Sequence, residues 1–221
     1  MPCAVVRSGL AGLILALVLL VPGLLVPGAN AAMAASLTIV VLGDSLTAGY
    51  GLAPGESFPD QLGRALKARG ADVEIVNAGV SGDTASDGLA RLDWALPDDA
   101  SAVIVELGGN DMLRGLDPEG TRRALDAILT ELGRRGLPVI LAGMEASRNL
   151  GQAYVEAFGT IFPDLAEKHG ALLYPFFLDG VALDPALNQP DGLHPNARGV
   201  AVIVERMLPT VEKLIARARG R

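Results

Sequence analysis

The alternation of five short apolar runs with longer amphipathic segments limits this chain to a narrow set of folds. The runs have the length of strands and are apolar at nearly every position, which is typical of strands buried on both faces. They cover residues 37–42, 73–78, 102–107, 138–143 and, more weakly, 171–176. Segments of helical period cover residues 57–70, 86–96, 118–136, 152–170 and 195–218. This order predicts right-handed crossovers and an α/β fold: a three-layer α/β/α sandwich with a parallel five-stranded sheet of the flavodoxin-like type.

The length of 221 residues suits one domain, and we expect residues 36–221 to form it. The first 35 residues differ in composition from the rest. A basic residue precedes a long apolar stretch, and the small residues ANAAMAAS follow, as in a signal peptide and its cleavage site. A membrane anchor is the alternative, but Pro22, Gly23 and Pro27 interrupt the apolar stretch. We therefore expect residues 1–35 to be a signal peptide and the protein to be secreted or periplasmic.

The charge and the scarcity of metal-binding side chains exclude several kinds of function. A formal net charge of -7 argues against a nucleic-acid partner, because binding phosphates needs clustered Lys and Arg. Cys3 is the only cysteine and precedes the apolar stretch, and the whole chain has two histidines. No phosphate-binding glycine motif follows any predicted strand. We expect neither a metal nor a cofactor.

Three of the predicted strands end in polar, glycine-rich sequences: GDSLTAG, NAGVSGDT and GGND. Parallel α/β sheets bind ligands at the carboxyl ends of their strands, so these sequences should meet at one edge. Glycine at such points lets the backbone approach a ligand closely. The G-x-S-x-G nucleophile elbow is absent, which removes the common α/β-hydrolase interpretation.

Ser45 has two interpretations, a nucleophile or the polar start of a helix, because Ser and Asp are also ordinary capping residues. A serine nucleophile needs a base. His169 lies where a predicted helix ends, and it is better explained as a residue facing the helix dipole. His194 follows Asp191 by three residues in a polar loop, so the carboxylate could hold Nδ1–H while Nε2 faces the serine.

Acyl transfer also needs donors for the developing oxyanion. The candidates are the backbone N–H groups of Ser45 and Gly82 and the side-chain amide of Asn110. Taken singly, a turn explains the glycine and a helix cap explains the asparagine.

The sequences VLGDSLTAGYGL, NAGVSGDTASDGLARL, VELGGNDMLRG, PFFLDGVA and DGLHPNARG together resemble the GDSL or SGNH hydrolase family over about residues 37–211. The resemblance is to its branch of small secreted arylesterases, acyl-CoA thioesterases and lysophospholipases. It implies that Ser45 is the nucleophile, His194 the general base and Asp191 the carboxylate that orients the histidine. It also implies an oxyanion hole made of Ser45, Gly82 and Asn110, with Asp44 shaping the turn.

Residues 144–154, MEASRNLGQAY, depart from the proline-containing loop that branch members often carry here. By the same resemblance this loop lines the acyl pocket, with Met144, Glu145, Arg148 and Leu150 as candidate substrate-binding residues. Leu150, Tyr154 and Phe158 follow at spacings of four, and such a stripe either packs against the sheet or borders the site.

We therefore expect a serine esterase that hydrolyses aryl and short-to-medium acyl esters, with acyl thioesters and lysophospholipids as further candidate substrates. The partner is then the small-molecule ester or thioester, with at most transient contact with lipid. One alternative is a carbohydrate or peptidoglycan O-acetylesterase, which would need a short polar pocket. The other is a lipid-binding protein on the same fold that does no chemistry.

Overall fold

The computed structural model describes residues 1–4 and 36–221, and its contacts separate Met1–Ala34 from a compact unit of Ala35–Arg221. The signal-peptide interpretation falls on residues 1–35, nearly all of which lie outside the described residues, and it stays a prediction. Among the helices that are described, none has the length and apolarity that crossing a membrane requires.

Five parallel strands form one sheet in the order β2-β1-β3-β4-β5. They are β1 (Leu37–Gly43), β2 (Val73–Gly79), β3 (Ala100–Glu106), β4 (Val139–Ala142) and β5 (Leu172–Tyr174). This is the flavodoxin-like order, whose switch point lies between the first and third strands. The strand register pairs Gly43 with Gly79 on one side and with Glu106 on the other, so the three polar strand ends meet at one edge. The predicted fold class is confirmed.

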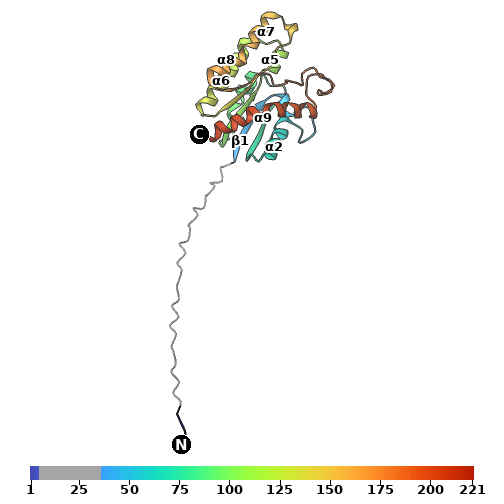
Figure 1. Cartoon of the computed structure of the whole chain (residues 1–221). Coiled ribbons are helices and arrows are strands. Elements are labelled where there is room, and N and C mark those ends of the chain that lie inside the picture. Colours follow the sequence, from blue (N-terminus) through green and yellow to red (C-terminus); the bar gives the residue numbers. More distant parts are fainter. Residues whose placement is uncertain (5–35) are drawn as a thin grey trace. The chain divides into compact units, whose positions relative to one another are not determined.

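Helices cover both faces of the sheet (Figure 1). In chain order they are α1 (Ser45–Ala48), α2 (Phe58–Ala68), α3 (Ala85–Ala90), α4 (Leu92–Ala95), α5 (Gly109–Leu113), α6 (Pro118–Arg134), the 3-10 helix η1 (Arg148–Leu150), α7 (Gln152–Gly159), α8 (Ile161–His169) and α9 (Ala197–Arg219). Helices α2 and α9 pack together on one face, and α3, α6 and α8 form the other layer. The sandwich therefore has the three expected layers.

Two of the predicted helices are each divided in the structure. Residues 86–96 form α3 and α4, which meet at Arg91. Arg91 is 7% exposed, and its guanidinium turns inward to bond the Gly43 carbonyl. Residues 152–170 form α7 and α8, which meet at Thr160. The hydrophobic period crosses both junctions, so the sequence pattern could not show them.

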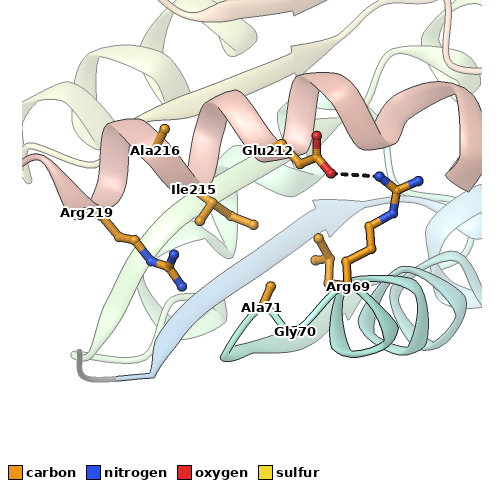
Figure 2. A pocket seen from close by; sticks show the side chains of 8 residues that line it. Arg69, Gly70, Ala71, Glu212, Ile215, Ala216 and Arg219 are labelled. Atoms are coloured by element: carbon orange, nitrogen blue, oxygen red, sulfur yellow. Dashed lines mark hydrogen bonds and ion pairs between the residues drawn. The ribbon is translucent and has the colours of Figure 1, made fainter. Parts of the chain in front are cut away.

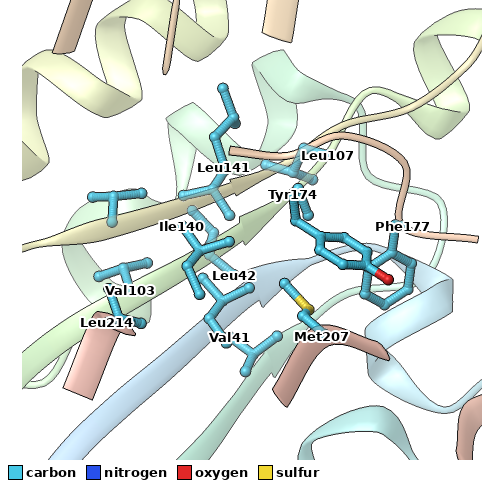
Figure 3. Packing of buried hydrophobic residues seen from close by; sticks show 14 of the residues in the cluster. Val41, Leu42, Val103, Leu107, Ile140, Leu141, Tyr174, Phe177, Met207 and Leu214 are labelled. Carbon is cyan, nitrogen blue, oxygen red and sulfur yellow. The ribbon is translucent and has the colours of Figure 1, made fainter. Parts of the chain in front are cut away.

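The core lies between the sheet and its helices, with β1 and β3 at its centre (Figure 3). Val41 and Val103 are fully buried, and Met207 and Leu214 of α9 have no exposed surface either. Strand β2 was expected to be buried on both faces, and this expectation is wrong: each of its residues stays at least partly exposed. The reason is that β2 is one of the two edge strands and has a neighbour on one side alone.

The aromatic stripe of α7 packs inward. Phe158 is fully buried, stacks on Tyr154 at 5.9 Å between ring centroids and meets Phe162 edge-on at 5.6 Å. A β-carbon on Gly108 would lie 3.2 Å from the Phe162 ring, so the glycine lets the loop after β3 rest on these rings. The stripe therefore supports the site from beneath, as the core interpretation predicted.

Candidate active site

Ser45 is the first residue of α1, shortly after β1, so it is both a helix start and a partly buried group at the edge of the sheet. Asp44 caps this helix, because its Oδ1 accepts a hydrogen bond from the Leu46 N–H at 2.9 Å. Asp44 thus shapes the turn, as the sequence suggested. The N–H groups of a first helical turn have no partner inside the helix, so the Ser45 N–H is available at this edge.

His194 comes to Ser45 from a loop near the other end of the chain. Its Nε2 lies 3.0 Å from Ser45 Oγ, and its Nδ1 lies 2.7 Å from Asp191 Oδ2. Asp191 Oδ1 also accepts the backbone N–H groups of His194 and Leu193 at 3.0 and 2.9 Å. The N–H of His194, that of Leu193 and the imidazole together lower the pKa of Asp191 to about 2. The carboxylate is therefore ionised at neutral pH.

Two further residues hold His194 in place. The ring of Tyr50 lies 4.7 Å from the imidazole, centroid to centroid, at a tilt of 40°. Gln189 connects the two loops: its N–H donates to the His194 carbonyl at 2.7 Å, and its Nε2 donates to the Tyr50 carbonyl at 2.8 Å. The serine loop and the histidine loop are thus tied together outside the triad.

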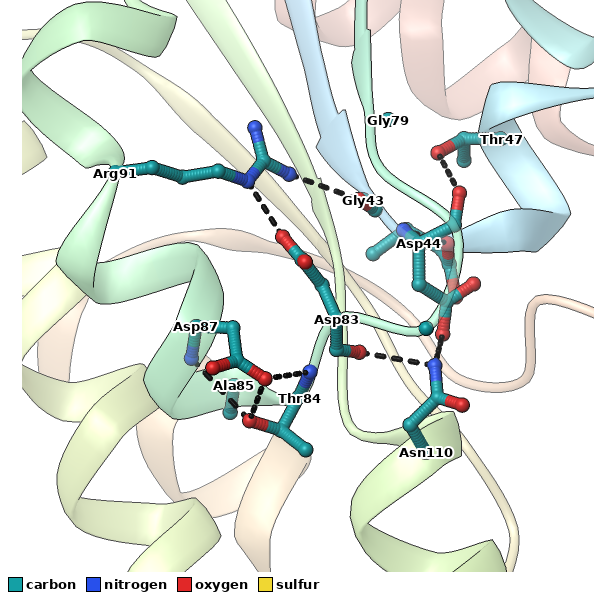
Figure 4. A network of polar contacts seen from close by, with 12 residues as sticks. Gly43, Asp44, Thr47, Gly79, Asp83, Thr84, Ala85, Asp87, Arg91 and Asn110 are labelled. Carbon is teal, nitrogen blue, oxygen red and sulfur yellow. Dashed lines mark hydrogen bonds and ion pairs between the residues drawn. The ribbon is translucent and has the colours of Figure 1, made fainter.

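The three candidate oxyanion donors differ in whether their hydrogens already form hydrogen bonds within the protein. The Asn110 amide donates to Asp44 Oδ2 at 3.0 Å and to the Asp83 carbonyl at 2.9 Å, which occupies both of its hydrogens (Figure 4). Gly82 has φ +92°, in the left-handed region that favours glycine, and its carbonyl accepts from Arg114 Nη2 at 2.7 Å. Within the described part of the chain, no hydrogen bond uses the Gly82 N–H. Its part in an oxyanion hole stays a prediction.

A buried ion pair supports these donors from below (Figure 4). Arg91 Nε lies 2.5 Å from Asp83 Oδ2, and Arg91 Nη2 donates to the Gly43 carbonyl at 3.0 Å. Both side chains of the pair are nearly buried, with exposures of 8% and 12%. Arg91 thus fixes the carbonyl before Asp44 and the residue after Gly82 with one guanidinium.

A cavity of about 130 Å³ opens beside Ser45, Asn110 and His194. Its other walls are mainly apolar and come from Leu46, Met112, Leu113, Met144, Leu178 and Leu193. Met144 lies where the sequence placed it, in the wall of the site. Glu145, Arg148 and Leu150 do not line this cavity, and a contribution of these three residues to substrate binding stays a prediction.

A larger cavity of about 300 Å³ lies away from this chemistry, between the end of α2 and α9 (Figure 2). Its lining includes Arg69 and Glu212, which form an exposed ion pair at 2.9 Å, but neither a nucleophile nor a histidine. The second histidine, His169, ends α8 and lies 2.6 Å from Asp126. In residues 1–4 and 36–221, no cluster of three or more His, Cys, Asp and Glu is arranged to hold a metal ion.

A model of the GDSL-like lipase/acylhydrolase family matches residues 41–202. The chain belongs to this family. A relative, the thioesterase 1/protease 1/lysophospholipase L1 of Escherichia coli K12, is 38% identical over 183 residues, which are 82% of this chain and 86% of the relative. An arylesterase of Vibrio mimicus is 39% identical over 180 residues, 80% and 88% of the two chains. The crystal structure of AlinE4, an SGNH-hydrolase family esterase, matches with a TM-score of 0.70 at 50% identity, over 82% of this chain and 98% of that one. The resemblance seen in the sequence is confirmed.

Sequence reasoning about this GDSL-family site missed four residues that contact its loops: Tyr50, Arg91, Gln189 and Glu106, whose Oε2 accepts the Asp44 N–H at 3.4 Å. One of them carried a signal, because Glu106 is the only charged residue in an otherwise apolar predicted strand. Tyr50 and Gln189 lie in polar loops, where their types are common. Arg91 lies in an amphipathic segment, where an arginine normally faces solvent.

Proposed function

We propose that this chain is a serine esterase that works through a covalent acyl-enzyme. The observation that carries the proposal is the continuous contact from Asp191 to His194 to Ser45, at 2.7 and 3.0 Å. Ser45 Oγ forms a bond to the substrate carbonyl carbon while its proton passes to Nε2 of His194. The bond to the leaving alcohol then breaks, and the alcohol takes that proton. Water attacks the acyl-serine in the same manner, its proton passing through His194 back to Ser45.

The tetrahedral intermediates would place their oxyanion between Ser45, Gly82 and Asn110. Two backbone N–H groups support this, because the Ser45 N–H lies in a first helical turn and the Gly82 N–H has no partner in the described residues. The Asn110 amide is already aimed by Asp44 and Asp83, so the oxyanion would share one of its two hydrogens. A donor that is held in place before the reaction needs little reorganisation when charge develops.

Asn110→Ala should therefore lower kcat by roughly 100- to 1000-fold while KM changes little, because the interaction strengthens in the transition state. Steady-state kinetics on an aryl ester measure this directly. Asn149→Ala, an exposed asparagine in η1, is the matched control and should keep the full kcat. An unchanged kcat in Asn110→Ala would leave Asn110 as a link between Asp44 and the Asp83 carbonyl alone.

The shape of the cavity favours small apolar acyl or aryl groups. Its volume of about 130 Å³ equals the liquid volume of roughly four water molecules and is below the roughly 300 Å³ at which drug-sized pockets begin. Leu113 and Leu193 line it and stay half-exposed, and Tyr50 is 54% exposed beside His194. This apolar rim supports transient contact with lipid. A carbohydrate or peptidoglycan O-acetylesterase remains the alternative, but it would need more polar walls.

Thioesters and lysophospholipids are further candidate substrates. They are proposed because one relative is named a thioesterase and lysophospholipase and another an arylesterase. The acyl-enzyme step is the same for an alcohol, a phenol or a thiol as leaving group. A non-catalytic lipid-binding protein would have no need of the Asp191, His194 and Ser45 contacts.

A series of 4-nitrophenyl and acyl-thioester substrates of increasing chain length tests the proposal. Aryl acetates and short to medium acyl esters should be turned over faster than long-chain triglycerides. Met144→Ala should move the preferred chain length upward, because it enlarges the cavity, with thermal unfolding as the check on folding. Leu150→Ala tests the loop, and an unchanged profile would remove Leu150 from the substrate-binding residues. Turnover of acetylated sugars without turnover of aryl esters would replace the proposal by the O-acetylesterase alternative.

We also propose that residues 1–35 direct export and that the mature enzyme is secreted or periplasmic. The support is the sequence pattern alone: a basic start, an apolar stretch and small residues before the first strand. Amino-terminal sequencing of the protein recovered from outside the cytoplasm should give a first residue just after Ala31, Ala32 or Ala35. A protein that keeps Met1 in the membrane fraction would favour the anchor instead.

A further inference from the structure

Glu106 is a fully buried carboxyl group that the proposed reaction does not use. It is the last residue of β3, lies opposite Gly43 of β1 and has no exposed surface. Its Oε2 accepts one long hydrogen bond, from the Asp44 N–H at 3.4 Å. Its Oε1 finds no hydrogen-bond partner within the described residues.

The burial of Glu106 and its shortage of hydrogen-bond donors disfavour an ionised carboxylate. A buried carboxylate is strongly destabilised unless several donors or a cation stabilise it, and Glu106 has a single long N–H. A neutral carboxylic acid, in contrast, brings its own hydrogen and has fewer oxygens to satisfy. The geometry therefore favours the protonated form of Glu106.

Asp44, its neighbour, is supplied with donors. It is 2% exposed, and its two oxygens accept from the Leu46 N–H at 2.9 Å and from the Asn110 amide at 3.0 Å. Burial raises the pKa of Asp44 to about 6, against the effects of the Leu46 N–H, a hydrogen bond with Glu106 and the charge of His194. Burial and the charge of Asp44 hold the pKa of Glu106 well above its usual range.

The other charged groups nearby do not neutralise Glu106. Asp83 adds a negative charge near Asp44, and Arg91 is committed to Asp83 and to the Gly43 carbonyl. The ring of His194 faces Ser45 and Asp191. When Glu106 and Asp44 together hold one proton, they carry a single negative charge. That charge lies on Asp44, which accepts hydrogen bonds from two donors.

We propose that Glu106 is a positioning residue that stays protonated at neutral pH and donates its hydrogen to Asp44, so that Asp44 stays an anion that holds α1 and the Asn110 amide. The pair would then fix the nucleophile turn and one oxyanion donor from below without touching substrate. Of these statements, only the role of Asn110 as an oxyanion donor rests on the proposed function.

The protonation state can be tested without turnover, by unfolding wild type and Glu106→Gln in denaturant between about pH 7 and about pH 9. The amide of glutamine imitates the neutral acid but cannot titrate. In wild type the unfolded chain releases the Glu106 proton that the folded chain keeps, so rising pH favours unfolding. The ratio of unfolding constants, wild type over Glu106→Gln, should rise about tenfold per pH unit until Glu106 ionises. A flat ratio would overturn the proposal.

A measurement on wild type alone serves if the variant folds poorly. Glutamate labelled with carbon-13 should show the infrared carbonyl band of a protonated acid at neutral pH, and its absence would equally overturn the proposal.

The positioning role is tested by comparing two variants in ester hydrolysis. Glu106→Leu fills similar space but has no hydrogen to donate. Its kcat should therefore fall at least tenfold while KM changes little. The acid limb of its pH profile should move to higher pH, because Asp44 then takes up a proton more easily. Glu106→Gln should restore kcat to near that of wild type. Equal impairment of both variants would refute the positioning role. A protein without esterase activity that still shows the rising ratio would refute the proposed function and keep the acid pair.

Discussion

Replacing Ser45 by alanine should lower kcat about 10⁶-fold and abolish labelling by a fluorophosphonate, because no other nucleophile in the described chain contacts His194. Mass spectrometry of the labelled wild type should locate one adduct, on Ser45. Ser86→Ala, an exposed serine on α3, is the matched control and should keep both labelling and turnover. Labelling at another residue together with full activity of Ser45→Ala would refute the triad.

Substitution of His194 tests the same triad independently of Ser45. His194→Ala should be impaired about as much as Ser45→Ala, and the double variant hardly more, since the two residues act as a unit. His169→Ala is the control of the same residue type: this ring contacts Asp126 and does not line the cavity beside Ser45, so the substitution should leave kcat unchanged. A large loss in His169→Ala with none in His194→Ala would reverse the assignment of the base.

Asp191→Asn should lower kcat about 10⁴-fold with the structure preserved. The neutral amide can donate to Nδ1 of His194 and thereby stabilise the tautomer whose proton faces the serine. That tautomer cannot accept the serine proton. Because the pKa of Asp191 is held at about 2, its ionised form persists as pH falls through the acidic range, and its contribution to stability is lost only below about pH 4. The acid limb of the wild-type pH profile should therefore not reflect Asp191.

The control for this substitution lies in the same loop. Asp184 Oδ1 accepts the Ala186 N–H at 2.8 Å but touches no histidine. Asp184→Asn should keep a kcat near that of wild type, and comparable losses in the two variants would mean that the loop is needed only for its fold. Thermal unfolding of both variants separates a folding defect from a catalytic one.

The sequence predicted the fold well because the hydrophobic period within each segment distinguishes strands from helices. The alternation of strands and helices along the chain is compatible with few topologies. Ser45, Asn110 and His194 could also be found, because the motifs that hold them, each common alone, together resemble the GDSL family. The supporting residues were harder. Gln189 and Arg91 act through hydrogen bonds to backbone carbonyls. Every residue type has a backbone carbonyl, so the sequence does not show which residue will accept such a bond. Which strand forms the sheet edge depends on global order, so the exposure of β2 was beyond local reasoning.

Ser45 and His194 are 149 residues apart in sequence and belong to the loops after the first strand and after the last. A ribosome therefore makes the proposed nucleophile early and the proposed base late. Until the segment beyond β5 has folded back, Ser45 of an emerging chain lacks its contact with His194. Contacts of such long range carry a larger entropic cost of loop closure. If the proposed triad acts, ester turnover therefore reports that the chain is made and folded at least as far as His194, which makes activity a measure of folding in refolding experiments.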